Sequence, residues 1–324
     1  MLRAAVIGLG RWGQTLVNSV QGKSDKITFV SGCTRTPAKA AGFLEKHGIA
    51  WANDYAAVLA DPKVEAVVLA TPHSQHAEQV VAAAKAGKQV FCDKPFTLTR
   101  KSAEEAIAAC RKAGVAICIG HNRRFLPAHQ ELCRMAQSGE LGTILHVEGA
   151  ITGAGGFSFP PGGWRASPSE SPAGGMTAMG IHLVDAMIAA VGPIAALSAL
   201  SWRRALEIPI DDTTAMLFRF KDGMAGTLAT SPATAQTWRM QIYGTKGTAE
   251  MRGENTLMIR PVQGAAEQKD YPPTDKERAE LEAFADAVAG RKPYPIPDAD
   301  VINGIAALEA IEPSTRSKGW IEIA

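Results

Sequence analysis

The first third of the chain alternates short β-branched runs with alanine-rich stretches that have a helical period. The strand candidates are nearly continuous apolar runs, which is typical of parallel strands covered on both faces. The helical stretches between them close on a glycine, as helices commonly do. This repeated β-α-β-α order predicts a doubly wound parallel sheet. The strand candidates are Ala4–Gly8, Ile27–Thr34, Val64–Thr71, Lys88–Asp93 and Val115–Gly120.

After Asn122 the pattern changes to long strand candidates, with one clear helix between Gly180 and Val191. An Asp-Gly pair, Asp222 and Gly223, predicts a tight hairpin turn between two of these strands. A stretch rich in Gly, Pro and Ser, from Gly153 to Gly175, predicts a long loop. We therefore expect an α/β domain with a doubly wound parallel sheet at residues 1–122. An α+β domain with a mostly antiparallel open-faced sheet is expected at residues 123–324.

Length and composition restrict the kind of protein. At 324 residues the chain is long enough for two domains, and its formal charge of +2 includes no basic block of the kind that binds nucleic acid. The five cysteines are scattered without a Cys-x-x-Cys pair, which favours a reducing compartment. The N-terminus enters a strand candidate at once, so no signal peptide is expected. No apolar run reaches the roughly 20 residues of a membrane span. These features predict a soluble cytoplasmic protein.

A Gly-x-Gly-x-x-Gly pattern follows the first strand candidate and opens a helix, in the sequence Val-Ile-Gly-Leu-Gly-Arg-Trp-Gly. In this context the first glycine allows the turn, the second admits a pyrophosphate and the third permits close helix packing. The helix N-terminus adds N–H groups and a partial positive charge for phosphate. The sequence thus predicts a Rossmann-type nucleotide site that involves Gly8, Leu9, Gly10, Arg11, Trp12 and Gly13.

The second strand candidate ends without the acidic residue that holds the ribose 2′-hydroxyl of NAD. Thr34 stands there and Arg35 follows it. Thr34 removes a repulsive carboxylate, and Arg35 is able to pair with a 2′-phosphate. We therefore expect NADP to be preferred over NAD, with a solvated surface arginine as the alternative.

Two more polar segments stand at the carboxyl ends of strand candidates, which is the edge where ligands bind in doubly wound sheets. Thr71, Pro72, His73 and His76 follow one strand, and one histidine is expected to touch the cofactor while the other orders the loop. No third ligand for a metal stands nearby. Asp93-Lys94-Pro95 ends the next strand. A lysine there would lie near the nicotinamide, where burial and the cationic ring lower its pKa toward a useful range.

These motifs together resemble the glucose–fructose oxidoreductase / inositol dehydrogenase / MocA family. The segments that carry the resemblance are "VIGLGRWG", "ATPHSQHAEQVVAAAKAGKQVFCDKP", "GHNRRF", "GGWR" and "GGMTAMGIHLVD". The family's Glu-Lys-Pro signature appears here with Asp93 in place of the glutamate. The resemblance implies an NAD(P)-dependent oxidoreductase with Lys94 as a catalytic residue beside the nicotinamide. It also implies that residues 1–122 form the Rossmann dinucleotide-binding domain. Residues 123–324 would then bind substrate and form the contacts of a dimer or tetramer.

In the second domain the resemblance implies that His182 shares the catalytic work with an aspartate four residues before it. Ala178 occupies the aspartate position here, so this chain departs from the family pattern. Asp185, one helical turn after His182, is a candidate to orient it. The resemblance further implies that Trp164, Arg165 and Arg123 lie near the cofactor or the domain junction. The alternative interpretation is that His182, which lies in a predicted amphipathic helix, is packed in the core and has a purely structural role.

The leading interpretation is an enzyme that interconverts an alcohol and a carbonyl on a sugar-like, cyclitol or hydroxylated carboxylate substrate. Arg165, Arg123 and Arg124 are the side chains that would recognise a carboxylate. The alternative is a cofactor-binding sensor that has lost its chemistry, which Ala178 favours. No nucleic acid, membrane or metal is expected as a partner. We expect the chain to form a homodimer or homotetramer.

Overall fold

The computed structural model describes residues 1–323, and the contacts divide them into two compact units. Unit 1 consists of Met1–Thr97, Lys101–Asn122 and Asp275–Asp298. Unit 2 consists of Leu98–Arg100, Arg123–Thr274 and Ala299 onward. The division at Asn122 coincides with the expected boundary, but the segment Asp275–Asp298 packs with unit 1 rather than with the second half of the chain.

Unit 1 is built on a six-stranded parallel sheet with the strand order β3-β2-β1-β4-β5-β6, as expected for a dinucleotide-binding fold. The strands are β1 (Leu2–Ile7), β2 (Ile27–Cys33), β3 (Ala50–Trp51), β4 (Ala66–Leu69), β5 (Gln89–Asp93) and β6 (Ile117–Gly120). The helices are α1 (Arg11–Val20), α2 (Pro37–His47), α3 (Tyr55–Ala60), α4 (His76–Lys85), α5 (Arg100–Ala113) and α8 (Lys276–Val288).

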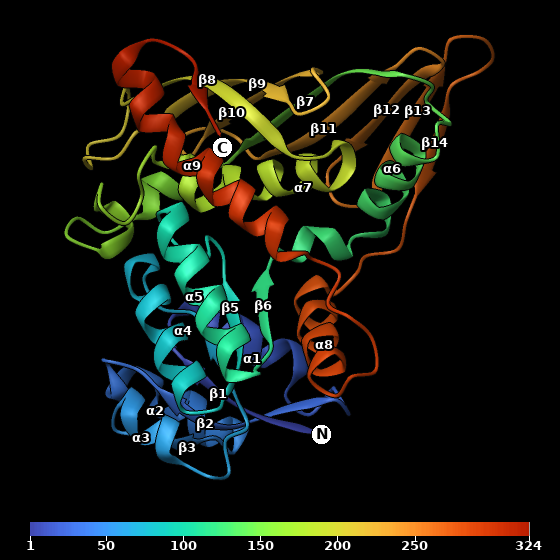
Figure 1. Ribbon diagram of the computed structural model, residues 1–324. Coiled ribbons are helices and arrows are strands. Elements are labelled where there is room, and N and C mark those ends of the chain that lie inside the picture. The colour runs from blue at the N-terminus through green and yellow to red at the C-terminus, as the bar shows by residue number, and fades with distance from the viewer. Residues whose placement is uncertain (324) are drawn as a thin grey trace. The chain divides into compact units, whose positions relative to one another are not determined.

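The five strands expected from the apolar runs are all present in this sheet, and β3 is an addition that the sequence did not predict. Helix α8 lies beside α1 (Figure 1), and its residues Leu281 and Phe284 join the same core cluster as Leu16 and Val17. The Phe284 ring also lies 5.7 Å from that of Phe91 on β5. Unit 1 therefore completes its core with a segment from the far end of the chain.

Unit 2 is a nine-stranded sheet with helices on one face, visible in the upper part of Figure 1. The strand order is β14-β13-β12-β11-β7-β10-β9-β8-β15. All neighbouring strands are antiparallel except β7 and β10, so the mostly antiparallel prediction is confirmed. The first strands are β7 (Ile144–Thr152), β8 (Ile194–Trp202), β9 (Thr213–Phe220), β10 (Ala225–Ser231) and β11 (Thr237–Gly244). The remainder are β12 (Gly247–Arg252), β13 (Thr256–Pro261), β14 (Glu267–Asp270) and β15 (Ile321–Glu322).

Three helices cover the inner face of this sheet, namely α6 (Pro127–Gln137), α7 (Ile181–Val191) and α9 (Asp298–Ser317). Only α7 was predicted from the sequence. Strand β9 shows the alternation that produces one covered face, since Met216 and Phe218 are buried while Leu217 is exposed. The expected hairpin turn joins β9 to β10, with Gly223 at a φ of 90°.

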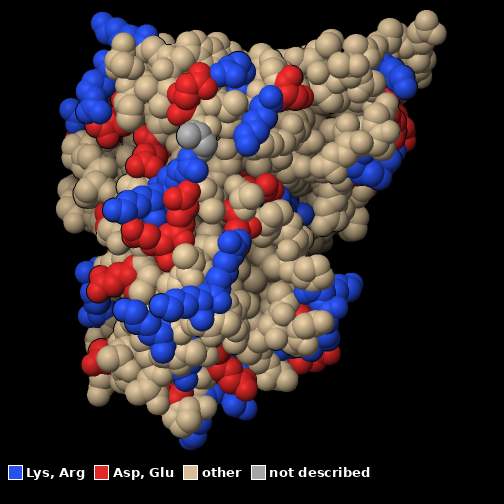
Figure 2. Space-filling model, viewed as in Figure 1, with Lys and Arg blue, Asp and Glu red and all other residues tan. Residues whose placement is uncertain are grey.

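None of the helices among residues 1–323 is both long and apolar enough to cross a membrane. On the visible surface of each unit, basic and acidic side chains are interspersed (Figure 2).

Candidate functional site

The glycine loop between β1 and α1 has the local geometry that phosphate binding requires. Gly8 has a φ of 96°, and a Cβ added there would lie 2.6 Å from the carbonyl oxygen of Ala70. A Cβ added at Gly13 would lie 1.9 Å from the carbonyl oxygen of Gly8. A Cβ added at Gly10 would meet no atom within 4 Å. Two of the glycines are thus needed for packing within the protein, and the remaining one faces open space.

Helix α1 begins immediately after Gly10, which is its N-cap and provides no side-chain hydrogen bond to the helix. A helix start without a side-chain cap leaves its first N–H groups to other acceptors, and phosphate oxygens suit them. The donor set and the open side of Gly10 therefore fit a nucleotide pyrophosphate.

Arg35, just beyond the carboxyl end of β2, is exposed, and Thr34 is partly buried. Beside them the short strand β3 pairs Trp51 with Gly32, and Asp54 caps α3 by accepting from the N–H of Ala57. Burial and the charge of Asp54 both raise the pKa of the neighbouring Cys33 thiol. An acidic side chain therefore lies near this strand end, which the sequence analysis missed because β3 was not predicted.

Asp93, the last residue of β5, is partly buried, and its Oδ1 is enclosed. Burial raises its pKa, while the charges of Lys94 and His76 and the nearby Trp12 indole oppose that effect. Neither Oδ1 of Asp93 nor Nε1 of Trp12 has a hydrogen-bond partner of normal geometry, although both atoms are buried. Buried polar atoms usually have a hydrogen-bond partner, and a ligand hydroxyl group suits both a carboxylate oxygen and an indole N–H.

Lys94 follows Asp93, and the Lys94–Pro95 peptide bond is cis, an isomer that occurs almost only before proline. The Lys94 side chain is partly exposed, whereas Cys92 and Phe96 on either side of the turn are fully buried. The lysine therefore stands at the carboxyl edge of the sheet, on the same edge as the glycine loop.

Of the two histidines that follow β4, His76 is fully buried and its ring nitrogens face backbone carbonyl groups. Those contacts favour the loop-ordering alternative for His76. They give no support to the expected contact between its ring and a cofactor. The His73 ring lies 6.0 Å from that of His76, and Thr71 donates a 2.6 Å hydrogen bond to Gln79.

In unit 2, a π-helical turn at Met176–Gly180 leads into α7 and contains Ala178. Such turns within helices are frequent at functional sites. The preceding Gly-Gly pair is required by packing, since a Cβ at Gly174 would lie 1.7 Å from the carbonyl oxygen of Asp211. His182 is the second residue of α7 and is 5% exposed.

Asp185, the expected orienting partner of His182, is engaged by a buried arginine. Its carboxylate accepts hydrogen bonds from the guanidinium of Arg124, with Nε–Oδ2 at 2.9 Å and Nη2–Oδ1 at 2.7 Å. Nη1 of Arg124 also lies 2.9 Å from Oδ2 of Asp300. Arg124 and Asp185 are 8% and 2% exposed. This buried ion-pair network occupies the Arg124 guanidinium, and it gives no support to the expectation that Arg124 recognises a substrate carboxylate.

The other arginines expected at the site have aromatic neighbours within unit 2. The guanidinium of Arg165 stacks on the Trp164 ring at 4.0 Å from its centroid, in a short helical turn. Arg123 lies over the Trp238 ring at 5.3 Å, and its Nη2 is 3.4 Å from Oε1 of Glu254. These contacts hold the planar groups in fixed orientations.

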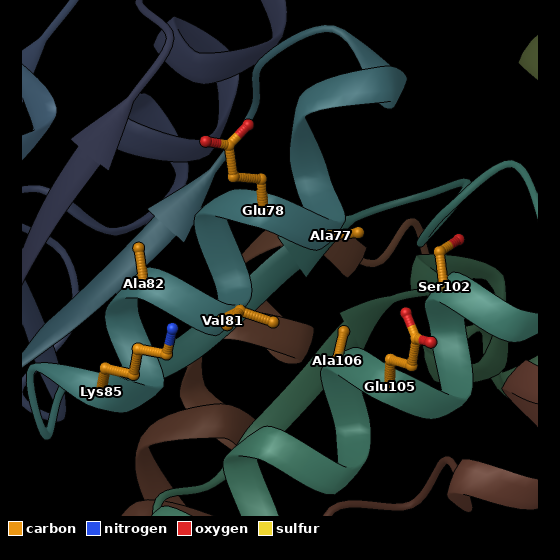
Figure 3. A pocket seen from close by; sticks show the side chains of 8 residues that line it. All are labelled: Ala77, Glu78, Val81, Ala82, Lys85, Ser102, Glu105 and Ala106. Carbon is orange, nitrogen blue, oxygen red and sulfur yellow. The ribbon is translucent and has the colours of Figure 1, made fainter.

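A shallow groove of about 390 Å³ on unit 1 lies between α4 and α5 (Figure 3). Small side chains of α4 and α5 line it, with charged groups along its rim. None of the expected catalytic or cofactor-binding residues lines this groove, so it is not the candidate site.

Two models of one protein family match the chain. The model of the oxidoreductase family with an NAD-binding Rossmann fold matches residues 2–121, and the GFO/IDH/MocA C-terminal domain model matches residues 129–250. Scyllo-inositol 2-dehydrogenase (NAD(+)) of Bacillus subtilis (strain 168) is 36% identical over 156 residues, which span 46% of this chain and 44% of that protein.

Solved structures are similar over nearly the whole chain. A protein from Desulfitobacterium hafniense, assigned as an NADPH-dependent oxidoreductase, has a TM-score of 0.92 at 25% identity and covers 99% of this chain and 97% of its own. Levoglucosan dehydrogenase in complex with NADH and levoglucosan has a TM-score of 0.89 at 20% identity, with 99% of both chains covered. The latter likeness shows the fold alone.

Proposed function

The chain belongs to the GFO/IDH/MocA family of oxidoreductases, and we propose that it interconverts an alcohol and a carbonyl on a sugar-like, cyclitol or hydroxylated carboxylate substrate. The observation that carries this proposal is the position of Lys94. It follows β5 at the carboxyl edge of the sheet, where the glycine loop leaves Gly10 open to a phosphate. The relative named scyllo-inositol 2-dehydrogenase supports the polyol class of substrate.

In the proposed reaction Lys94 exchanges a proton with the substrate hydroxyl, or polarises the carbonyl in the reverse direction. When bound, the nicotinamide cofactor supplies the hydride acceptor or donor. Asp93, whose Oδ1 is buried without a hydrogen-bond partner, is proposed to accept from a ribose hydroxyl. His182 of unit 2 is the proposed second polar group, with its role modified because Ala178 replaces the family aspartate.

We propose that NADP(H) binds more tightly than NAD(H). Thr34 and the exposed Arg35 support this preference, because no carboxylate ends β2 and a guanidinium is available for a 2′-phosphate. A charge-assisted hydrogen bond contributes about 1.5–3 kcal/mol, which corresponds to a preference of roughly tenfold or more. Fluorescence titration with both cofactors measures it. Arg35→Ala should narrow the gap, and a wild-type protein that prefers NAD(H) would refute the assignment.

Steady-state turnover tests the proposed reaction. The purified protein is assayed with polyols, cyclitols, aldoses and hydroxy acids in the presence of NADP⁺ and of NAD⁺, with reduced cofactor followed at 340 nm. Turnover of at least one alcohol supports the enzyme. Tight cofactor binding without turnover across the panel would favour the sensor, for which the replacement of the family aspartate by Ala178 is the specific observation.

We also propose that the protein forms a homodimer or homotetramer. The outer face of the unit 2 sheet exposes Leu200, Trp202 and Leu217, at 50%, 41% and 41% of their surface. Exposed apolar side chains in neighbouring strands favour a protein contact. Light scattering coupled to gel filtration measures the mass, and Leu217→Glu should lower it. A monomer in the wild type would refute this proposal.

The five free thiols support a reducing compartment such as the cytoplasm.

A further inference from the structure

The imidazole of His76, the first residue of α4, is enclosed by backbone carbonyl groups. Nδ1 lies 3.0 Å from the oxygen of Pro95 and 3.2 Å from that of Phe96. Nε2 lies 3.0 Å from the oxygen of Thr71. A carbonyl oxygen accepts and never donates, so the ring makes hydrogen bonds on both sides only if both nitrogens carry a proton.

These three carbonyl groups belong to two loops at the ligand-binding edge of unit 1. Thr71 follows β4, whereas Pro95 and Phe96 follow β5, which is the neighbour of β4 in the sheet. Lys94 directly precedes this pair. The His76 ring therefore joins the turn that carries the lysine to the end of the adjacent strand.

The surroundings of the His76 ring act on its pKa in opposite directions. Burial has the largest effect and lowers the pKa of His76, and Asp93 and the carbonyl groups of Pro95, Thr71 and Phe96 oppose this effect without reversing it. A ring with one proton donates to one of the two loops and lies against the carbonyl group of the other. Asp93 in turn interacts with both Lys94 and His76. The Asp93 carboxylate therefore has Lys94 on the turn and His76 on α4 as electrostatic neighbours.

We propose that His76 is a positioning residue for Lys94. The His76 ring holds the Lys94–Phe96 turn against the end of β4. This inference rests on the proposed function, in which Lys94 acts on the substrate hydroxyl. It assigns no contact between His76 and either substrate or cofactor. A displacement of about 1 Å at a reacting group costs on the order of 100-fold in rate, so a loosened turn lowers kcat before it affects cofactor binding.

Lys88 offers a matched control within the same unit. It is 9% exposed, and its Nζ donates 2.8 Å and 2.7 Å hydrogen bonds to the carbonyl oxygens of Asp61 and Val64. It thus joins the segments that enter β4 and β5, at the opposite edge of the sheet from His76. Lys88→Met removes a similar link between the same two strands without touching the Lys94 turn.

The test compares His76→Ala, His76→Gln and Lys88→Met with the wild type in kcat, KM, cofactor Kd and melting temperature. We expect His76→Ala to lower kcat by roughly 100-fold, with substrate KM and cofactor Kd within about threefold of the wild type. His76→Gln retains a donor toward one loop, so its kcat should be intermediate and its fold intact. Lys88→Met should lose comparable melting temperature while its kcat stays within about twofold.

The proposal is overturned if folded His76→Gln keeps the wild-type kcat, or if Lys88→Met loses as much activity as the His76 variants. A rise in cofactor Kd that matches the fall in kcat would instead make His76 a cofactor contact, and would also overturn the proposal.

If the wild type turns over no substrate, the proposed function fails, and the positioning role of His76 is then tested without turnover. Reductive ¹³C-methylation labels Lys94, with Lys94→Arg to assign its NMR signal. An unchanged signal in His76→Gln refutes the positioning role.

Discussion

The buried network of Arg124, Asp185 and Asp300 makes a quantitative prediction about stability. Asp185→Asn removes the carboxylate that lies 2.7 Å from Nη2 of Arg124, while the guanidinium stays buried. Breaking a buried ion pair by removing one partner costs about 3–5 kcal/mol. Asp300, 2.9 Å from Nη1, still compensates part of the charge, so we expect a loss of about 3 kcal/mol, near the lower limit.

Urea unfolding of Asp185→Asn measures this loss of stability, and a double-mutant cycle of Arg124 and Asp185 measures the coupling energy of the pair. Arg124→Met and Asp185→Leu should each destabilise the protein, and the double variant should be more stable than either single one, because neither partner is left buried alone. Equal falls in kcat for Arg124→Met and Asp185→Asn agree with a structural network. If Asp185→Asn costs under about 1 kcal/mol, or lowers kcat far more than Arg124→Met, the network account is refuted and Asp185 regains the role of orienting His182.

Further predictions concern the glycine loop and one buried acid. Gly10→Ala should fold normally but bind cofactor at least tenfold more weakly, because its Cβ enters the open space beside the glycine loop. Gly13→Ala should instead lower the melting temperature, because its Cβ clashes with the carbonyl oxygen of Gly8. If both variants had equal effects on melting temperature in calorimetry and on cofactor affinity in titration, this distinction would be contradicted. Burial raises the pKa of Asp212, but the backbone N–H groups of residues 204–206 outweigh it and lower that pKa. The stabilisation is therefore complete above the unfolded pKa of about 3.9 and is lost as the pH falls below it. Asp212→Asn should show a smaller loss of unfolding free energy below pH 4, and an identical pH profile would refute the assignment.

The sequence predicted those parts of the fold whose pattern is local. Continuous apolar runs identified five strands of the unit 1 sheet, but β3 has two residues and carries no pattern of its own. Helix α8 could not be assigned to unit 1, because its Leu281 and Phe284 pack against residues more than 190 positions away, such as Phe91. Membership of a core depends on tertiary contacts rather than on order along the chain.

The candidate site was predictable to a similar extent. The motif spacing identified the glycine loop and Lys94, since both follow strands at the carboxyl edge of the sheet. The helical period placed Asp185 one turn after His182, but the period does not show that Arg124 from a neighbouring segment takes its carboxylate. The role of His76 was equally hidden, because it depends on carbonyl groups that lie 19 and 20 residues further along the chain.

The central claim is that β5 ends on Lys94 because this side chain takes part in the reaction. Lys94→Ala should lower kcat by ~10²–10⁴, the range for a positioned acid–base group, while cofactor Kd changes less than about threefold. Lys101→Ala is the control, since Lys101 lies in the same unit with its side chain 85% exposed. The account predicts that kcat is lost only in the Lys94 variant. Turnover by folded Lys94→Ala at the wild-type rate would contradict it.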